Sequence, residues 1–151
     1  MTEIVSSMGM FLIDDSLTDT STPLKEYLDT SKLDYSLDSL KLVDQYLDKV
    51  RENIKSFTSD QHIKVIARCG AYCGEVIRKN TKKKFEWIEY DTAISLDPRI
   101  KSIGEKSIAT LYILHGEGKD FSFPFSKVGK YIQNGPEDSL WGFASMILKG
   151  E

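Results

Sequence analysis

The sequence predicts an α+β protein in which a two-helix hairpin packs on a small, mainly antiparallel sheet and short helices close the fold. Three observations lead to this prediction. Apolar residues recur at steps of three and four between about residues 37 and 79, which is typical of amphipathic helices. Short aromatic and β-branched runs follow between residues 85 and 123, which favours strands. Proline and glycine then separate two short helical segments near the end of the chain.

The first long helix is expected at about residues 37–55, with Ser36 as its N-cap. Its apolar stripe consists of Leu40, Val43, Leu47, Val50 and Ile54. The second long helix is expected at about residues 60–79. Thr58 and Gln61 precede it at the spacing of a capping box, in which each side chain accepts a hydrogen bond from the other residue's backbone.

Two glycines interrupt the second helix, although each costs roughly 1 kcal/mol relative to alanine in a helix interior. Gly70 and Gly74 are four residues apart and therefore lie on one side of the helix. Their missing side chains would allow another backbone or a large aromatic ring to approach closely. The glycines therefore predict a central helix that is covered on more than one side.

The sheet is expected to begin with a strand at residues 85–90 and to continue with a hairpin formed by residues 107–115 and 120–123. The intervening residues 91–105 contain Pro98 and Gly104 and are expected to be irregular, with Ile100 and Ile103 on a short edge strand. Two closing helices are expected at residues 124–133 and 137–149, separated by Gly135 and Pro136.

The 151 residues are expected to form a single domain, because a chain of this length can bury a sizeable core. Residues 1–35 show weak periodicity and are expected to be a loosely structured segment, mostly loop with one or two helical turns, that docks on the body. The first residues lack a basic region, and the nearby apolar run is too short for a signal sequence or a membrane span. We therefore expect a cytoplasmic protein without membrane association.

The charge is distributed unevenly along the chain. Residues 1–60 contain 12 acidic and 6 basic side chains, whereas the remainder contains 11 acidic and 14 basic side chains. A row of carboxylates on and before the first long helix could attract and dock a basic protein. The candidate partner-binding residues are Asp34, Asp38, Asp44, Asp48 and Glu52. The alternative is an ordinary solvated acidic helix face.

A second candidate site is a cleft where the second helix meets the sheet. Glu75 and Arg78 are three residues apart on that helix and can form an ion pair. Together with Tyr72 and Trp87 they could line a small-molecule or catalytic cleft, which requires Glu75 to be partly desolvated. The alternative is an exposed salt-bridge strip without a function of its own.

Other chemistries are disfavoured by residue type and spacing. Cys69 and Cys73 lie among apolar residues of a predicted helix, so we expect buried thiols, with no metal site and no cofactor. His62 and His115 lack partners at a spacing that indicates a catalytic triad. The basic run at residues 82–84 lies beside aromatic residues, but the acidic overall balance argues against nucleic-acid binding.

Several short stretches carry a resemblance to known proteins: residues 70–78, Trp87, residues 123–128 and residues 134–140. In this order they resemble a widespread set of small bacterial proteins of unknown function that have two helices, a short sheet and closing helices. The resemblance covers about residues 36–148 and implies no activity. In size, single-domain form and charge asymmetry the chain also resembles bacterial toxin-immunity proteins. We therefore expect a non-enzymatic module that neutralises a cationic toxin through an acidic surface.

Overall fold

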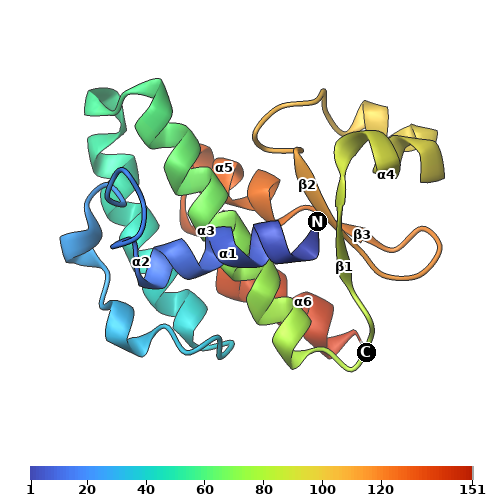
Figure 1. The fold of residues 1–151 in the computed structure, drawn as a ribbon, viewed down its shortest axis with the longest axis horizontal. Helices are drawn as coiled ribbons and strands as arrows, with labels where there is room; N and C mark the ends of the chain where they lie inside the picture. Colours follow the sequence, from blue (N-terminus) through green and yellow to red (C-terminus); the bar gives the residue numbers. More distant parts are fainter. Residues whose placement is uncertain (151) are drawn as a thin grey trace.

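A computed structural model describes residues 1–150 and has the expected α+β architecture (Figure 1). The helices are α1 (Thr2–Ile13), α2 (Ser39–Asn53), α3 (Ser59–Asn80), α4 (Tyr90–Leu96), α5 (Pro124–Asn134) and α6 (Leu140–Lys149). The strands are β1 (Glu86–Glu89), β2 (Tyr112–His115) and β3 (Phe121–Ser122). Short 3-10 helices lie at Lys25–Tyr27, Thr30–Lys32, Ile54–Ser56, Pro98–Ser102 and Pro136–Asp138.

The helical hairpin of α2 and α3 begins and ends within two residues of the predicted bounds, apart from the last turn of α2, which is a 3-10 turn. The capping box is present at the start of α3. The Thr58 hydroxyl accepts a hydrogen bond from the Gln61 N–H at 3.1 Å, and the Gln61 side chain accepts one from the Thr58 N–H at 2.9 Å. The prediction of Ser36 as N-cap was wrong, because α2 begins at Ser39 and its N-cap is Asp38, which makes no capping bond with its side chain. The Ser36 hydroxyl accepts a hydrogen bond from the Ser39 N–H at 3.2 Å in the turn before the helix.

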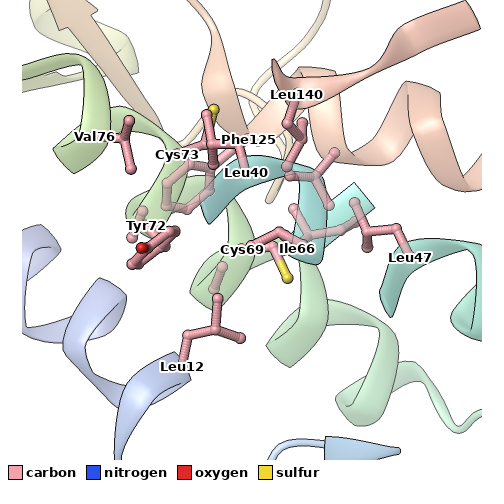
Figure 2. Close-up of a cluster of buried hydrophobic side chains, with 14 of the residues drawn as sticks. Leu12, Leu40, Leu47, Ile66, Cys69, Tyr72, Cys73, Val76, Phe125 and Leu140 are labelled. Carbon is pink, nitrogen blue, oxygen red and sulfur yellow. The ribbon is translucent and has the colours of Figure 1, made fainter. Parts of the chain in front are cut away.

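Helix α3 is the centre of the molecule, and its residues from Val65 to Ile77 are all buried. Helices α1, α5 and α6 pack against it, and α2 contacts it through the Ser39 and Tyr72 hydroxyls, which lie 2.7 Å apart. Figure 2 shows the resulting core, in which Cys69, Tyr72 and Cys73 of α3 lie among apolar side chains from the other helices. A helix covered on several sides is the arrangement that the broad apolar arc of the sequence predicts.

The two glycines of α3 allow the close approach that the sequence predicts. A Cβ atom on Gly74 would overlap the indole ring of Trp87 from β1. A Cβ atom on Gly70 would lie 2.7 Å from the Phe125 ring of α5. Both contacts are shorter than van der Waals distance, so only glycine fits at these positions. The two glycines thus set how closely the sheet and α5 approach α3.

The sheet has the order β1-β2-β3, and both pairs of neighbouring strands are antiparallel. Trp87 of β1 lies opposite Leu114 of β2. Strand β2 is shorter than the predicted 107–115. Its expected first half is a turn closed by a hydrogen bond from the Thr110 N–H to the Ser107 carbonyl at 3.1 Å.

The prediction for residues 1–35 was wrong in its first third, which forms helix α1 rather than loop. Val5, Gly9 and Leu12 lie on one face of α1 and are buried against α3. A Cβ atom on Gly9 would lie 3.1 Å from the backbone nitrogen of Tyr72, so the two helix backbones are nearly in contact. Residues Ser6, Ser7 and Gly9 disfavour an isolated helix, and packing on α3 supplies the missing stability.

The prediction for residues 91–105 was also wrong, because this segment forms α4 and a following 3-10 helix rather than an irregular loop with an edge strand. Ala93 and Ile100 are buried against Ile113 of β2 and form a small second core on the far side of the sheet. Ile103 is 57% exposed. Ile100 therefore anchors a helical turn on the sheet, and neither isoleucine extends the sheet edge.

The two closing helices are separated at Gly135 and Pro136, as predicted. Helix α5 ends at Gly135, whose φ of +92° is a conformation that favours glycine. A 3-10 turn then begins at Pro136, and α6 begins at Leu140, three residues later than predicted. The Ser139 hydroxyl caps α6 by accepting a hydrogen bond from the Gly142 N–H at 3.1 Å.

Candidate functional site

Glu75 lies at the junction of α3, α1 and β1, and its side chain is only 2% exposed. Its two carboxylate oxygens accept hydrogen bonds from Nη1 of Arg78 at 3.1 and 2.8 Å. One of them also accepts a hydrogen bond from the indole N–H of Trp87 at 3.0 Å. Arg78 in turn donates from Nε to the Phe85 carbonyl at 3.1 Å. These bonds tie the last turns of α3 to the strand that follows it.

The carboxyl group of Glu75 stays ionised despite its burial. Burial alone would raise its pKa, but hydrogen bonds from Arg78, Trp87 and Ser6, together with the Arg78 charge, lower the pKa below its ordinary value. A buried carboxylate in which a guanidinium and an indole occupy the acceptor positions is not poised to take a proton. The arrangement is that of a structural ion pair.

The structure places the four residues of the expected cleft in and beside this buried junction. Tyr72, Glu75 and Trp87 are buried, and Arg78 covers the carboxylate from the outside. None of the four residues lines any of the five surface hollows described for residues 1–150. The desolvation of Glu75 that the cleft required is present, and Trp87, which packs on Gly74, donates its indole N–H to the carboxylate.

Tyr72 points away from the Glu75 junction's hydrogen bonds and instead contacts Ser39 and Tyr35. Its hydroxyl lies 2.7 Å from the Ser39 hydroxyl and accepts a hydrogen bond from the Tyr35 N–H at 3.0 Å. The Tyr35 and Tyr72 rings are stacked with their centroids 5.0 Å apart. Tyr72 thus holds the start of α2 and the residues before it against α3.

The acidic row on α2 is not a free surface, because its first member caps another helix. Asp44 accepts hydrogen bonds from the Ser139 hydroxyl at 2.6 Å, from the Leu140 N–H at 2.8 Å and from the Trp141 N–H at 3.4 Å. Burial raises the pKa of Asp44 above its ordinary value, although these hydrogen bonds act in the opposite direction. Asp44 therefore joins α2 to the N-terminus of α6, where a negative charge is favourable.

The next two members of the row also have partners within the chain. Asp48 accepts a hydrogen bond from the Tyr131 hydroxyl of α5 at 2.6 Å. Glu52 is exposed and lies 3.5 Å from Nζ of Lys49. The spacing of four residues did place the carboxylates along one side of α2, but that side faces α5 and α6 for two of the three.

Asp34 and Asp38, the two other candidate partner-binding residues, are exposed. Asp34 accepts a hydrogen bond from the Ser36 N–H at 3.0 Å, and bonding from the Ser36 hydroxyl and then from this N–H lowers the pKa of Asp34. Asp38 lies 3.5 Å from Nζ of Lys41, with its side chain 81% exposed. Both residues lie at the end of a longer acidic stretch, the segment 14–38 that connects α1 with α2.

We call residues 14–38 the acidic segment, because they hold 7 acidic and 2 basic side chains and so account for most of the negative charge of the first 60 residues. Six of the seven carboxylates are exposed. In Figure 1 the segment, in blue and light blue, lies at one end of the molecule, and the sheet lies at the other. The sequence analysis counted charges over residues 1–60. A count over shorter segments would have located this surface from the sequence.

Two cationic side chains of α3 hold the start of the acidic segment in place. Arg68 is buried, and it donates to the Thr22 hydroxyl at 2.7 Å and to the Thr20 carbonyl at 3.1 Å. Lys64 also donates to the Thr20 hydroxyl. Asp15 accepts hydrogen bonds from the Thr22 N–H at 2.8 Å and from Lys25, and these bonds lower its pKa. The segment is thus attached to α3 at Thr20 and Thr22, and it continues through two short 3-10 helices.

A hollow of about 420 Å³ lies between the end of α1 and the acidic segment. Its apolar lining comes from Leu12, Ile13 and Leu28, and its acidic lining from Asp14, Asp15 and Glu26. Leu17 and Tyr27, on the same segment, are 92% and 51% exposed. The end of the molecule that carries the acidic segment thus also presents apolar side chains to solvent.

The cysteines, His115 and the basic run, which the sequence analysis also considered, are engaged in contacts within the chain. Cys69 and Cys73 are fully buried free thiols, and burial raises the pKa of both far above the ordinary value. The His115 ring stacks on Phe121 with centroids 4.8 Å apart. Lysines 82–84 line a hollow together with Glu117 and Asp120, so carboxylates are interspersed with the basic run.

Within residues 1–150, no group of three or more histidine, cysteine, aspartate or glutamate side chains is arranged to hold a metal ion. Over the same residues, every helix is too short or too polar to cross a lipid bilayer.

The chain was compared with known protein families, with curated proteins and with solved structures, and none of the three comparisons gives a match.

Proposed function

We propose that this protein is a non-enzymatic binding module that docks a basic protein on the acidic segment. The observation that carries the proposal is the concentration of exposed carboxylates on residues 14–38, a segment held to α3 by Arg68 and Lys64. A surface of one charge sign steers an oppositely charged protein and raises its association rate.

The composition of the surface suits a protein partner better than a small ion. Leu17 and Tyr27 supply exposed apolar and aromatic groups beside the carboxylates. Interfaces of this kind combine apolar anchors, which supply most of the affinity, with a charged rim that selects the partner. The partner class that fits is a small cationic protein, such as the catalytic domain of a toxin, and the module would then act as an immunity-type inhibitor.

Hydrogen bonds keep the acidic surface charged. Bonds from Ser16, Ser31 and Ser36 lower the pKa of Asp14, Asp29 and Asp34 respectively. The electrostatic attraction should therefore persist in mildly acidic solution and weaken as salt is added, because exposed charges are screened.

The test is a charge reversal confined to this surface. The variant Asp19→Lys/Glu26→Lys/Asp38→Lys changes exposed residues of the segment. We expect it to slow association with the partner by about tenfold or more at low salt, with the fold intact. Proteins captured from the source cells by the wild type would be identified by mass spectrometry, and their association rates measured against each variant at several salt concentrations.

The matched control is Glu89→Lys/Glu105→Lys/Glu117→Lys, which makes the same change in net charge with exposed residues outside the acidic segment. We expect this control to keep most of the association rate of the wild type. Equal rates for the wild type and the acidic-segment variant, or equal losses in both variants, would count against the proposal.

A further inference from the structure

Arg68 is the most deeply buried arginine of the chain, and no carboxylate forms an ion pair with it. The residue is only 6% exposed. Arg78 and Arg99 are paired with carboxylates at 2.8 and 2.9 Å, whereas no carboxylate oxygen within residues 1–150 lies within 4.0 Å of the Arg68 guanidinium. Asp15 acts on Arg68 through its charge from a greater distance. Because buried charges are normally paired, this cation requires an explanation.

The Arg68 guanidinium is bonded to uncharged groups of the acidic segment. It donates from Nη1 to the Thr22 hydroxyl at 2.7 Å and from Nη2 to the Thr20 carbonyl at 3.1 Å. The centroid of the Phe11 ring lies 5.8 Å from the guanidinium carbon. A guanidinium carries five N–H donors and suits carboxylate and phosphate groups best. Arg68 therefore places a positive charge beside Thr20 without a paired anion.

Lys64 brings a second positive charge to Thr20. It lies one turn before Arg68 on α3, and its Nζ donates to the Thr20 hydroxyl. Among residues 1–150 its ammonium group has no carboxylate within 4.0 Å. Like charges four residues apart repel each other along a helix, and an anion close to both would remove this repulsion. Thr20 itself is exposed, so its hydroxyl is accessible to an enzyme.

Two carboxylates oppose an anion at this position. Asp19 precedes Thr20 in the sequence and is exposed, so solvent screens its charge. Asp15 accepts hydrogen bonds from the Thr22 N–H at 2.8 Å and from Nζ of Lys25 at 3.2 Å, so a cation already offsets its charge. An anion in direct contact with Lys64 is attracted at a shorter distance than either carboxylate repels it, and Coulomb energy falls with distance.

We propose that Thr20 is a phosphorylation site, and that its phosphate contacts Lys64 and lies in the field of the Arg68 charge. The donor is a nucleoside triphosphate bound to a protein kinase. The Thr20 oxygen forms a bond to the γ-phosphorus, and the bond from that phosphorus to the β-phosphate oxygen breaks. The hydroxyl proton passes to a base of the kinase, and a nucleoside diphosphate leaves.

The phosphate supplies the anion that the two cations of α3 lack. A phosphothreonine carries a charge of about −1.5 to −2 at pH 7 and three acceptor oxygens. Bonded to Lys64, it fastens the start of the acidic segment to α3 more strongly than the hydroxyl does. This proposal is independent of the partner that docks on the acidic segment.

The first test measures the phosphate directly. Phosphothreonine is encoded at position 20 of the full chain, and its second ionisation is followed by phosphorus NMR. We expect its pKa to be lower by about 0.5 or more in the folded protein than in the same protein in urea, because neighbouring cations favour the dianion. Phosphoserine at Ser95 is the control, since this exposed hydroxyl of α4 bonds the Thr92 carbonyl at 2.6 Å rather than a cation.

The second test couples the phosphate to Lys64. Lys64→Gln should remove most of the pKa difference at phosphothreonine 20. It should also lower the equilibrium constant for folding of the phosphorylated protein about threefold more than that of the unmodified protein, the effect of one partly exposed ion pair. Lys101→Gln, at an exposed lysine of the 3-10 helix Pro98–Ser102, should lower both constants equally or not at all.

The third test maps phosphopeptides of the protein isolated from its source cells, where we expect phosphate on Thr20. The proposal is overturned if Thr20 is unmodified in that protein. It is also overturned if phosphothreonine 20 has the same pKa in the folded and unfolded chain, or if Lys64→Gln leaves this pKa and the stability of the phosphorylated protein unchanged.

Discussion

At the scale of single residues, Gly74 determines where Trp87 lies and thereby how the Glu75 junction is built. The indole ring occupies the space of the missing Cβ, and its N–H reaches the Glu75 carboxylate at 3.0 Å. A glycine that lowers helix propensity by roughly 1 kcal/mol is kept where a ring packs directly on the helix backbone. Replacing Gly74 with alanine therefore tests two opposing effects on stability, the loss of packing against Trp87 and the gain in helix propensity.

We expect Gly74→Ala to lower the free energy of unfolding by about 1–3 kcal/mol, because the added methyl group displaces Trp87. Gly129→Ala is the matched control in α5, where an added Cβ atom meets nothing within 4 Å. It should raise the free energy of unfolding by about 0.5–1 kcal/mol through helix propensity alone. Urea denaturation of both variants measures these values, and a stable Gly74→Ala would show that Trp87 can move freely.

Glu75 should make stability depend on pH in a defined direction. Its folded-state pKa is below the ordinary value of 4.5, so its contribution is complete above about that pH and is lost as pH falls through the folded-state pKa. Relative to Glu75→Gln, the wild type should be more stable by about 1.5–3 kcal/mol at neutral pH, the value of hydrogen bonds to a charged group.

The measurement is urea denaturation of the wild type and Glu75→Gln between pH 3 and pH 7. The difference in free energy of unfolding should shrink only at the acidic end of this range. If this difference stayed constant down to pH 3, protonation of Glu75 would not contribute to the pH dependence of stability, which would contradict the prediction.

At the scale of elements, the position of α6 depends on a carboxylate that comes from another helix. Asp44 of α2 accepts bonds from the first turn of α6, and Ser139 caps the same turn. The N-terminal N–H groups of a helix need such acceptors. The spacing of the carboxylates assigned Asp44 to an interaction surface, but in the structure Asp44 holds α2 and α6 together.

We expect Asp44→Ala to lower the free energy of unfolding by about 0.5–2 kcal/mol, the usual effect of removing an N-cap. Asp38→Ala should change it by less than about 0.5 kcal/mol, because Asp38 is exposed and makes no capping bond with its side chain. Thermal unfolding followed by circular dichroism compares the two variants. Similar effects of both would contradict a capping role for Asp44.

At the scale of the whole molecule, every helix except α4 contributes to one core around α3, and the chain carries opposite charge balances in its two parts. Cys69 and Cys73 lie at the centre of that core, where burial raises the pKa of both thiols and keeps them protonated. The thiolate is the reactive form, so both thiols should react only when the core opens. Their reactivity therefore reports on the cooperativity of the entire fold.

We expect a thiol reagent at pH 8 to label the folded protein more slowly than the unfolded chain by about 10³ or more, which is the range of unfolding equilibria. Urea should raise the rate in parallel with unfolding. Single Cys69→Ala and Cys73→Ala variants tell the two thiols apart. Rapid labelling of either thiol in native buffer would mean that part of α3 opens without global unfolding.

The sequence by itself determined the α2–α3 hairpin, the capping box, the three strands and the close approach at Gly70 and Gly74. These features follow from periodicity, capping residues and the size of a side chain, all of which are local properties. The same reasoning placed the thiols in the core, since they are surrounded in sequence by apolar residues.

Only the tertiary structure decided which polar residues are free. Helix α1 forms because Gly9 lets it lie against α3, and Asp44, Asp48 and Glu75 are occupied by groups up to 97 residues away in the chain. A spacing of three or four residues gives the side of the helix on which a carboxylate lies, but not the element that packs against that side. Whether a charge is solvated or bonded depends on contacts between distant segments, and this moved the candidate surface from α2 to residues 14–38.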